Sequence, residues 1–165
     1  MELKVKLTDG APLPKHARPG DAGMDLTTRN AVTVYPGETI MVHTGVWVEI
    51  PEGYYGAVVP RSGMASKRKL APVNSPGTID SGYRGEVLVP LHNFASPSTL
   101  VQCRTISEGL HWELWPNHDA IQRVEAGERV AQLIVVPYAA CECVQVGELS
   151  DTERGDGGFG STGAV

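Results

Sequence analysis

The sequence predicts an all-β fold of the jelly-roll type, a distorted barrel or sandwich with one short helix. Short alternating or β-branched runs recur along the chain, and Gly, Pro and Asp turn signals separate them. No segment of useful length carries apolar residues at the helical spacing. The expected strands lie at or within residues 3–7, 31–60, 85–91, 98–103, 128–138 and 143–149.

The elements can be justified in chain order. LKVKL (3–7) alternates, and residues 31–60 read as several strands joined by turns at PGE, HTG and PEG. SGMASKRKLA (62–71) is the exception, because helix formers follow Ser62 and predict two helical turns. CVQVGEL (143–149) alternates again and closes the series of strands.

Two segments differ from the rest. Residues 92–126 hold two of the three tryptophans with little periodicity, and so long a connection between strands is commonly functional. From about residue 150 the apolar content falls away. We therefore expect a β domain over residues 1–149 and a flexible arm over residues 150–165.

Composition limits the classes of function. A chain of 165 residues with 41% hydrophobic and 20% charged residues is typical of one globular domain. Its net charge of −5 argues against a nucleic-acid or membrane-surface binder, although a few local arginines could still hold a small anion. The three cysteines form no disulfide framework, and MELKVKLTDG has no apolar signal region, so we expect a cytoplasmic protein.

The C-terminal RGDGGFGSTG (154–163) has the composition of a disordered tail, which is at least as good an interpretation as a ligand-binding one. It nevertheless carries groups suited to a nucleotide. The Arg154 guanidinium fits phosphate oxygens, the hydroxyls of Ser161 and Thr162 can donate hydrogen bonds, and Phe159 has no local packing partner.

VPRSGMASK (59–67) places Arg61, Ser62 and Gly63 where a strand gives way to the short helix. A guanidinium, a hydroxyl and free helix N–H groups together make an anion site. An ordinary Ser N-cap beside a solvated arginine is about equally compatible with this segment.

VNSPGTIDSGYRGEVLV (73–89) predicts a β-hairpin with its tip near Ser81 and Gly82. Asp80 would stand at the rim, with Tyr83 across from it. Asp80 is either a general base or a turn aspartate, and Asn74 either reads a base edge or caps the loop. Asp25 in GDAGMDL (20–26) and Gln132 in GERVAQLIV (127–135) are polar residues in strands, and the histidines show no metal-ligand spacing.

DAGMDL, PRSGMASK, NSPGTIDSGYRGEV, GERVAQLIV and RGDGGFGSTG, in this order, closely resemble the five motifs of the trimeric dUTP pyrophosphatases (dUTPases). The resemblance runs from about Leu3 to Gly163. It implies a homotrimer of jelly-roll-like subunits with three active sites at subunit interfaces, each closed by the arm of another subunit. It also implies Mg²⁺-dependent hydrolysis of dUTP to dUMP and pyrophosphate, which keeps uracil out of DNA.

The resemblance implies roles for single residues. Asp80 resembles the residue that activates the water attacking the α-phosphorus, and Tyr83 the one that packs on deoxyribose. Asn74 and the hairpin backbone from Gly77 resemble the uracil reader. The residues that resemble phosphate binders are Arg61, Ser62, Gly63 and Gln132. In the arm, the outer phosphates would be held by Arg154, Gly160, Ser161 and Thr162, and Phe159 would stack on uracil. Asp25 would support the phosphate and metal region, with Mg²⁺ held mainly by the triphosphate and waters.

The sequence departs from the family pattern at two places. Met24 replaces the usual aromatic of the first motif, and we expect packing to adjust around this flexible side chain. About twenty extra residues lie within residues 95–120. We expect this insert to pack Trp112 and Trp115 on the barrel; the alternative is a protein-binding surface anchored by them. A dCTP deaminase is the less favoured enzyme, because that relative lacks the RGDGGFGSTG arm.

Overall fold

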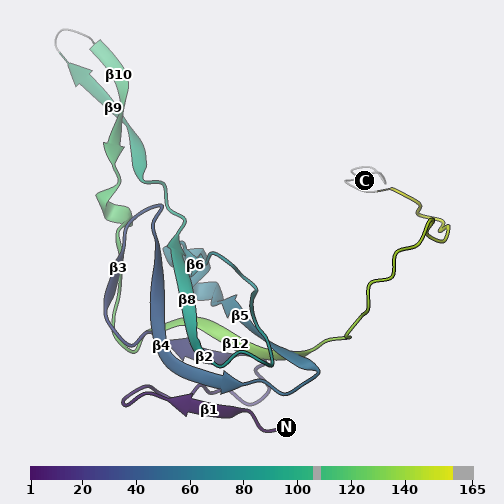
Figure 1. Ribbon diagram of the computed structural model, residues 1–165. Coiled ribbons are helices and arrows are strands. Elements are labelled where there is room, and N and C mark those ends of the chain that lie inside the picture. The colour runs from purple at the N-terminus through teal and green to yellow at the C-terminus, as the bar shows by residue number, and fades with distance from the viewer. Residues whose placement is uncertain (106–108, 158–165) are drawn as a thin grey trace.

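Two four-stranded antiparallel sheets form the body of the protein in the computed structural model, which describes residues 1–105 and 109–157 (Figure 1). One sheet has the order β1–β4–β8–β6, and the other has the order β2–β12–β5–β7. The strands of the first sheet are Lys4–Leu7, Thr39–Glu49, Glu86–Asn93 and Leu70–Pro72. Those of the second are Met24–Thr27, Arg129–Pro137, Tyr54–Pro60 and Gly77–Ile79.

Two smaller sheets complete the fold. β3 (Val32–Val34) pairs with β11 (Gln122–Val124), and β9 (Ser98–Thr105) pairs with β10 (Gly109–Pro116). The helical elements of the described residues are α1 (Ser62–Arg68) and the 3₁₀ turn η1 (His118–Ala120). The prediction of an all-β fold with one short α-helix is thus confirmed, although strand pairing among the described residues does not close a barrel. No helix in these ranges is long and apolar enough to cross a membrane.

The core lies between the two large sheets. Along β8 every second residue is buried, beginning with Val87 and ending with Asn93, so one face of the strand points into the protein. Leu26 and Leu133, on strands of the second sheet, belong to the same core cluster and are fully buried. Removing such aliphatic side chains from water supplies most of the favourable free energy of folding.

The predicted HTG turn is a bulge inside β4 rather than a turn. β4 runs through it and pairs with β8 on both sides, with a register shift between His43 and Trp47. Gly45 has a left-handed φ of 70° at this point, and the buried Thr44 hydroxyl donates to the Val87 carbonyl at 2.6 Å. Because that carbonyl is satisfied by the hydroxyl, the strand can continue through the irregularity.

Helix α1 spans seven residues, which confirms the two helical turns predicted within residues 62–71. Lys69 takes a left-handed φ of 58° and ends the helix, and Leu70 then enters β6 fully buried. Burial of Leu70 in the core therefore overrides the helix propensity of the last residues.

The predicted hairpin at residues 77–87 does not form. A turn is present, since the Tyr83 N–H donates to the Asp80 carbonyl at 3.0 Å. Its two flanking strands nevertheless belong to different sheets, because β7 pairs with β5 while β8 pairs with β4 and β6. The buried face of β8 fixes its place opposite β4, so the turn carries the chain from one sheet to the other.

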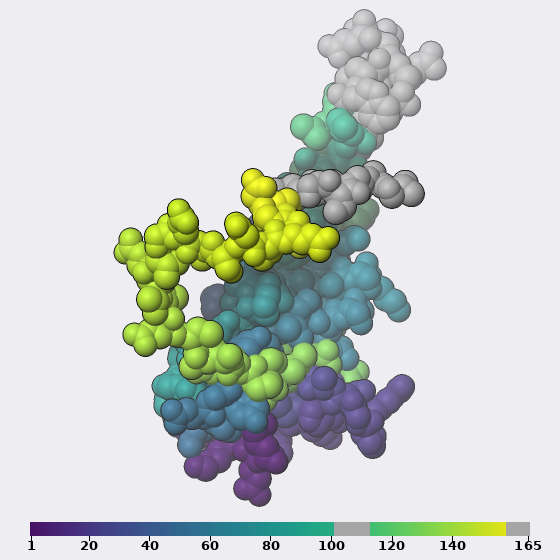
Figure 2. Space-filling model, turned by 90° about the vertical axis from the view of Figure 1, so that its right-hand side faces the viewer, coloured from purple at the N-terminus to yellow at the C-terminus, as the bar shows by residue number. Residues whose placement is uncertain are grey.

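Residues 143–149 contain no strand, contrary to prediction. After β12 the described chain leaves the body without helix or strand (Figure 1), and Figure 2 shows the same residues standing out toward the viewer. Val144 and Leu149 are exposed, as are the free thiols of Cys141 and Cys143. An alternating pattern makes a strand only where a neighbouring strand offers hydrogen bonds, and none of the described residues does so here.

Replacing Gly45 by alanine should destabilise the protein more than the same change at Gly53. Both residues have a left-handed φ, but a Cβ at Gly45 would lie 2.6 Å from Arg29 and Thr8 side-chain carbons, whereas nothing lies within 4 Å at Gly53. Backbone strain alone predicts a loss of about 1 kcal/mol for Gly53→Ala, and added overpacking predicts about 2–4 kcal/mol for Gly45→Ala. Urea unfolding of both variants checks this, and equal losses would contradict it.

Candidate active site

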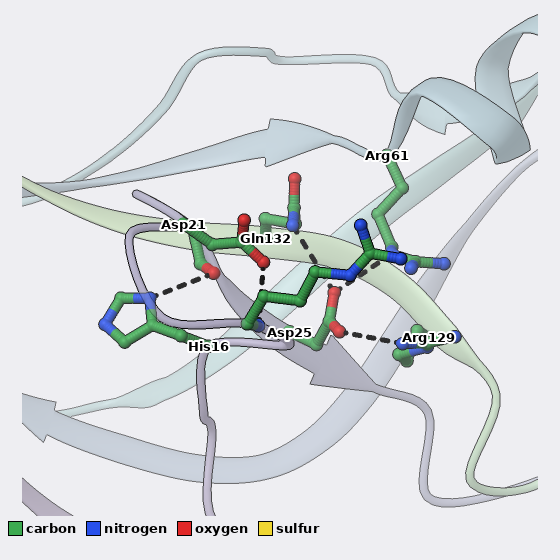
Figure 3. Close-up of polar contacts among 8 residues, drawn as sticks. His16, Asp21, Asp25, Arg61, Arg129 and Gln132 are labelled. Atoms are coloured by element: carbon green, nitrogen blue, oxygen red, sulfur yellow. Dashed lines mark hydrogen bonds and ion pairs between the residues drawn. The ribbon is translucent and has the colours of Figure 1, made fainter.

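One group of predicted residues gathers around the carboxylate of Asp25 (Figure 3). The Arg61 Nε donates to Asp25 Oδ1 at 2.9 Å, and the Arg129 Nη1 donates to Oδ2 at 3.1 Å. The Gln132 amide also faces Oδ1, at 3.5 Å. The Asp25 side chain is only 10% exposed, so the two guanidinium groups offset the cost of burying its charge.

Three strands bring these side chains together. Asp25 on β2 lies opposite Gln132 on β12, and Arg61 follows β5 directly after Pro60, which pairs with Ala131. In a regular strand Arg129 and Gln132 would point to opposite faces, because they are three residues apart. A register shift between Arg129 and Ala131 turns both toward Asp25.

Ser62 and Gly63 begin α1 beside this group. Arg61 occupies the N-cap position with extended backbone and makes no side-chain capping bond, so Ser62 is not the N-cap. No acidic residue lies in the first turn, and a Cβ built on Gly63 would have no atom within 4 Å. The start of the helix is therefore open and borders the cationic side chain of Arg61.

A second group gathers at the turn that follows β7. Asn74 packs against Gly77, with its Nδ2 3.1 Å from where a Cβ would stand. Asp80 and Tyr83 line one surface hollow of about 300 Å³ together with Met41. A carboxylate and an aromatic ring thus border the same apolar hollow.

The two groups lie at opposite ends of β5. Ile79 pairs with Gly56, which places Asp80 beside Tyr55 at the start of the strand, while Arg61 follows its last residue. At about 3.3 Å per residue, the Asp80 and Arg61 backbones are roughly 20 Å apart. Within one chain the two residues therefore do not lie side by side.

Of the predicted arm residues, the structure describes Arg154, which is not brought to either group. The Arg154 Nε donates to the Gly157 carbonyl at 2.9 Å, within a turn of the departing segment. Phe159, Gly160, Ser161 and Thr162 lie outside the described residues.

The insert is a β-hairpin that projects from the body (Figure 1). Its described side chains do not pack on the sheets as expected, because Leu114 is 69% exposed and Trp115 is 52% exposed. The side chain of Trp112 lies outside the described part. A two-stranded ribbon with alternating side chains cannot turn both faces toward the body, which is why the expected packing fails.

Sequence reasoning missed Arg129 and Glu86. Arg129 was hidden by the bulge in β12, which alternation cannot reveal. Burial alone would raise the pKa of Glu86, but hydrogen bonds from His43 and the Gly45 N–H outweigh it and hold that pKa below its ordinary value. The available signal was the position of Glu86 directly after YRG, close to Tyr83, the residue predicted to pack on deoxyribose.

Carboxylates are not arranged as a preformed metal site. Residues 1–105 and 109–157 contain no cluster of three or more His, Cys, Asp or Glu side chains able to hold a metal ion. Both Asp25 oxygens already accept hydrogen bonds from cationic or amide groups.

The dUTPase family model matches the chain over residues 9–105 and 101–163. The chain belongs to the dUTPase family. The deoxyuridine 5'-triphosphate nucleotidohydrolase of Cutibacterium acnes is 48% identical over 151 residues, which cover 92% of this chain and 85% of that protein. The predicted family is confirmed, and the two matched stretches meet within β9, inside the segment expected as an insert.

Solved dUTPase structures agree with the fold. That of Staphylococcus bacteriophage 80alpha with dUpNHpp has a TM-score of 0.81 and 37% identity, covering 99% of both chains. A mutant dUTPase from phage phi11 of S. aureus has a TM-score of 0.72 and 31% identity, covers 90% of this chain and 98% of that one, and coordinates a structural Mg(II) ion. Met24, the departure from the usual motif, packs half-buried against the dUTPase core, as expected.

Proposed function

We propose that this dUTPase hydrolyses dUTP to dUMP and pyrophosphate in the cytoplasm, keeping uracil out of DNA. The observation that carries the proposal is the family match along nearly the whole chain, with relatives that are deoxyuridine 5'-triphosphate nucleotidohydrolases. The Asp25 group and the Asp80 turn supply the two kinds of chemistry this reaction needs, a cationic phosphate pocket and a carboxylate base.

In the proposed mechanism Asp80 orients a water and takes its proton as the water attacks the α-phosphorus. A carboxylate within hydrogen-bond reach of the attacking water can serve as its general base. Arg61, Ser62, Gly63 and Gln132 hold the phosphates, and Asn74 with the Gly77 backbone reads uracil. The arm residues Arg154, Phe159, Gly160, Ser161 and Thr162 close over the nucleotide.

Positioning and charge neutralisation supply most of the acceleration in such phosphoryl chemistry. Asp25 contributes indirectly, because it fixes the guanidinium of Arg61 while leaving the outer nitrogens of Arg61 for the ligand. Mg²⁺ would arrive with the triphosphate, held by phosphate oxygens and waters, and would offset charge on the leaving pyrophosphate.

We further propose a homotrimer in which each active site takes Arg61 from one subunit and Asp80 from another. The separation of the two groups along β5 supports this arrangement, since one chain leaves them roughly 20 Å apart. The arm of another subunit would close over the site.

Asp80→Asn should abolish turnover without unfolding the protein. Losing a general base costs about 10²–10⁴-fold in rate, and the amide is nearly isosteric. Pyrophosphate release is measured with Mg²⁺ and separately with dUTP, dCTP, dTTP and UTP, using Asp119→Asn on the exposed η1 as the matched control. Release from dUTP alone, lost only in Asp80→Asn, supports the proposal; a fully active Asp80→Asn protein would refute this mechanism.

Mixing two inactive variants should restore activity if the site is shared. An Asp80→Asn subunit retains Arg61 and an Arg61→Ala subunit retains Asp80, so a mixed trimer rebuilds complete sites at some interfaces. The two proteins are unfolded together, refolded and assayed with dUTP against each variant refolded alone. Activity that never exceeds that of the separate variants, in trimers shown by mass to be mixed, would place both residues of each site in one chain.

The β9–β10 hairpin supports a second role, the binding of a regulatory protein. Leu100 and Leu114 pair across the two strands and are both largely exposed, and Trp115 adds an exposed indole. Aromatic and aliphatic anchors of this kind dominate interface energetics. The phage 80alpha dUTPase, in the work on its dUPNHPP complex, is described as controlling the transfer of virulence genes.

A double change of Leu100 and Leu114 to Asp should abolish partner binding and leave dUTP hydrolysis within about twofold, because the hairpin stands away from both residue groups. A protein retained by the wild-type chain is purified and titrated against both forms by calorimetry, with Glu2→Asp/Glu52→Asp as the control. Equal affinity for both forms would exclude the hairpin as the binding surface.

A further inference from the structure

Tyr83 is held by the two residues that follow Arg84. Its hydroxyl donates to the Glu86 backbone carbonyl at 2.9 Å, and its ring lies over Gly85. A Cβ built on Gly85 would stand 2.3 Å from the Tyr83 hydroxyl oxygen and 2.4 Å from the adjoining ring carbon. Only a glycine at position 85 lets the ring adopt this orientation.

Glu86 is itself anchored in the bulge of β4. Its carboxylate accepts a hydrogen bond from the Gly45 N–H at 2.7 Å and faces the His43 Nδ1 at 2.9 Å. Gly45 has a left-handed φ of 70° at this bulge, and its N–H meets the Glu86 side chain instead of a strand carbonyl. The Glu86 side chain is 18% exposed, and its lowered pKa is consistent with a carboxylate held in its charged form.

The turn before Tyr83 is braced as well. The Arg84 Nη1 donates to the Ser81 carbonyl at 2.6 Å and to the Tyr83 carbonyl at 2.8 Å. Tyr83 and Glu86 both border the hollow that Asp80 shares. A chain of contacts therefore runs from the β4 bulge through Glu86 to the ring that faces this hollow.

We propose that Glu86 and Gly85 are positioning residues that lock the Tyr83 ring against the nucleotide sugar and thereby set the preference for deoxyribose over ribose. The proposal rests on the proposed function, in which Tyr83 packs on the sugar of dUTP. The Tyr83 ring can exclude the 2′-hydroxyl of ribose only if the ring cannot shift by a fraction of an ångström. Close packing and the hydrogen bonds of the supporting residues supply that rigidity. Glu86 acts through Tyr83 and is not assigned contact with the reacting atoms.

The test compares kcat/KM for dUTP and for UTP in the wild type, Gly85→Ala, Glu86→Ala and Glu86→Gln. Gly85→Ala displaces the ring directly, and Glu86→Ala removes the anchor, so each should reduce the dUTP-to-UTP ratio by about tenfold or more. Glu86→Gln keeps one acceptor for the Gly45 N–H and should fall between Glu86→Ala and the wild type. Glu52→Gln, an exposed glutamate in the turn after β4, is the control and should leave the ratio unchanged.

The dUTP-to-UTP ratio of kcat/KM distinguishes a role of Gly85 and Glu86 in positioning Tyr83 from a role in the stability of the fold. A merely structural role would lower the melting temperature and reduce turnover of both nucleotides equally, and an unchanged ratio in Gly85→Ala and Glu86→Gln overturns the inference. Glu86→Gln preserves size and shape, so it keeps the test decisive if Glu86→Ala fails to fold. A wild-type protein that leaves dUTP intact refutes the proposed function, which is a different outcome from an active enzyme whose variants keep full selectivity.

Discussion

The ladder of β5 with β12 and β7 is the constraint from which the site geometry follows. β12 sets Gln132 and Arg129 near the end of β5, and β7 delivers Asp80 to its start. Since residues of these strands belong to the buried core, neither group can slide toward the other without breaking it. The separation of the Asp25 group from Asp80 is thus built into the strand register, and it underlies the proposal of a shared site.

At one end of β5, the Asp25 carboxylate balances the positive charges of Arg61 and Arg129. Two guanidinium groups and an amide surround its carboxylate, so removing any one partner leaves a buried charge less compensated. An incoming triphosphate would meet arginines already oriented by Asp25, which reduces the entropy lost on binding. The same carboxylate limits the positive potential of the pocket, which favours a ligand that brings its own cation.

Most strands of the two large sheets could be predicted from sequence, and the grouping of Asp25 with Arg61 and Gln132 agrees with their assignment to one phosphate region. The failures share a cause, because each depends on contacts distant in sequence. The HTG segment looks like a turn in sequence, because only its pairing with β8 shows that it is a bulge within β4. The segments on either side of the 80–83 turn look like the two strands of a hairpin, because only packing in the core shows that they belong to different sheets. Bulges in β12 and β4 also hid Arg129 and Glu86, because one extra residue reverses the alternation that pattern reading assumes.

Residues 143–149 show the limit of a single chain most clearly. Val144 and Val146, which alternation would place on one face of a strand, are exposed, and so is Leu149. Covering such side chains and pairing such a backbone both need a neighbour, and the described residues of the same chain provide none. The separation of Asp80 from Arg61 along β5 points in the same direction, since the proposed site needs both residues together. The unpaired segment 143–149 and the separation of Asp80 from Arg61 are two independent observations. Both are explained by the proposed association of subunits.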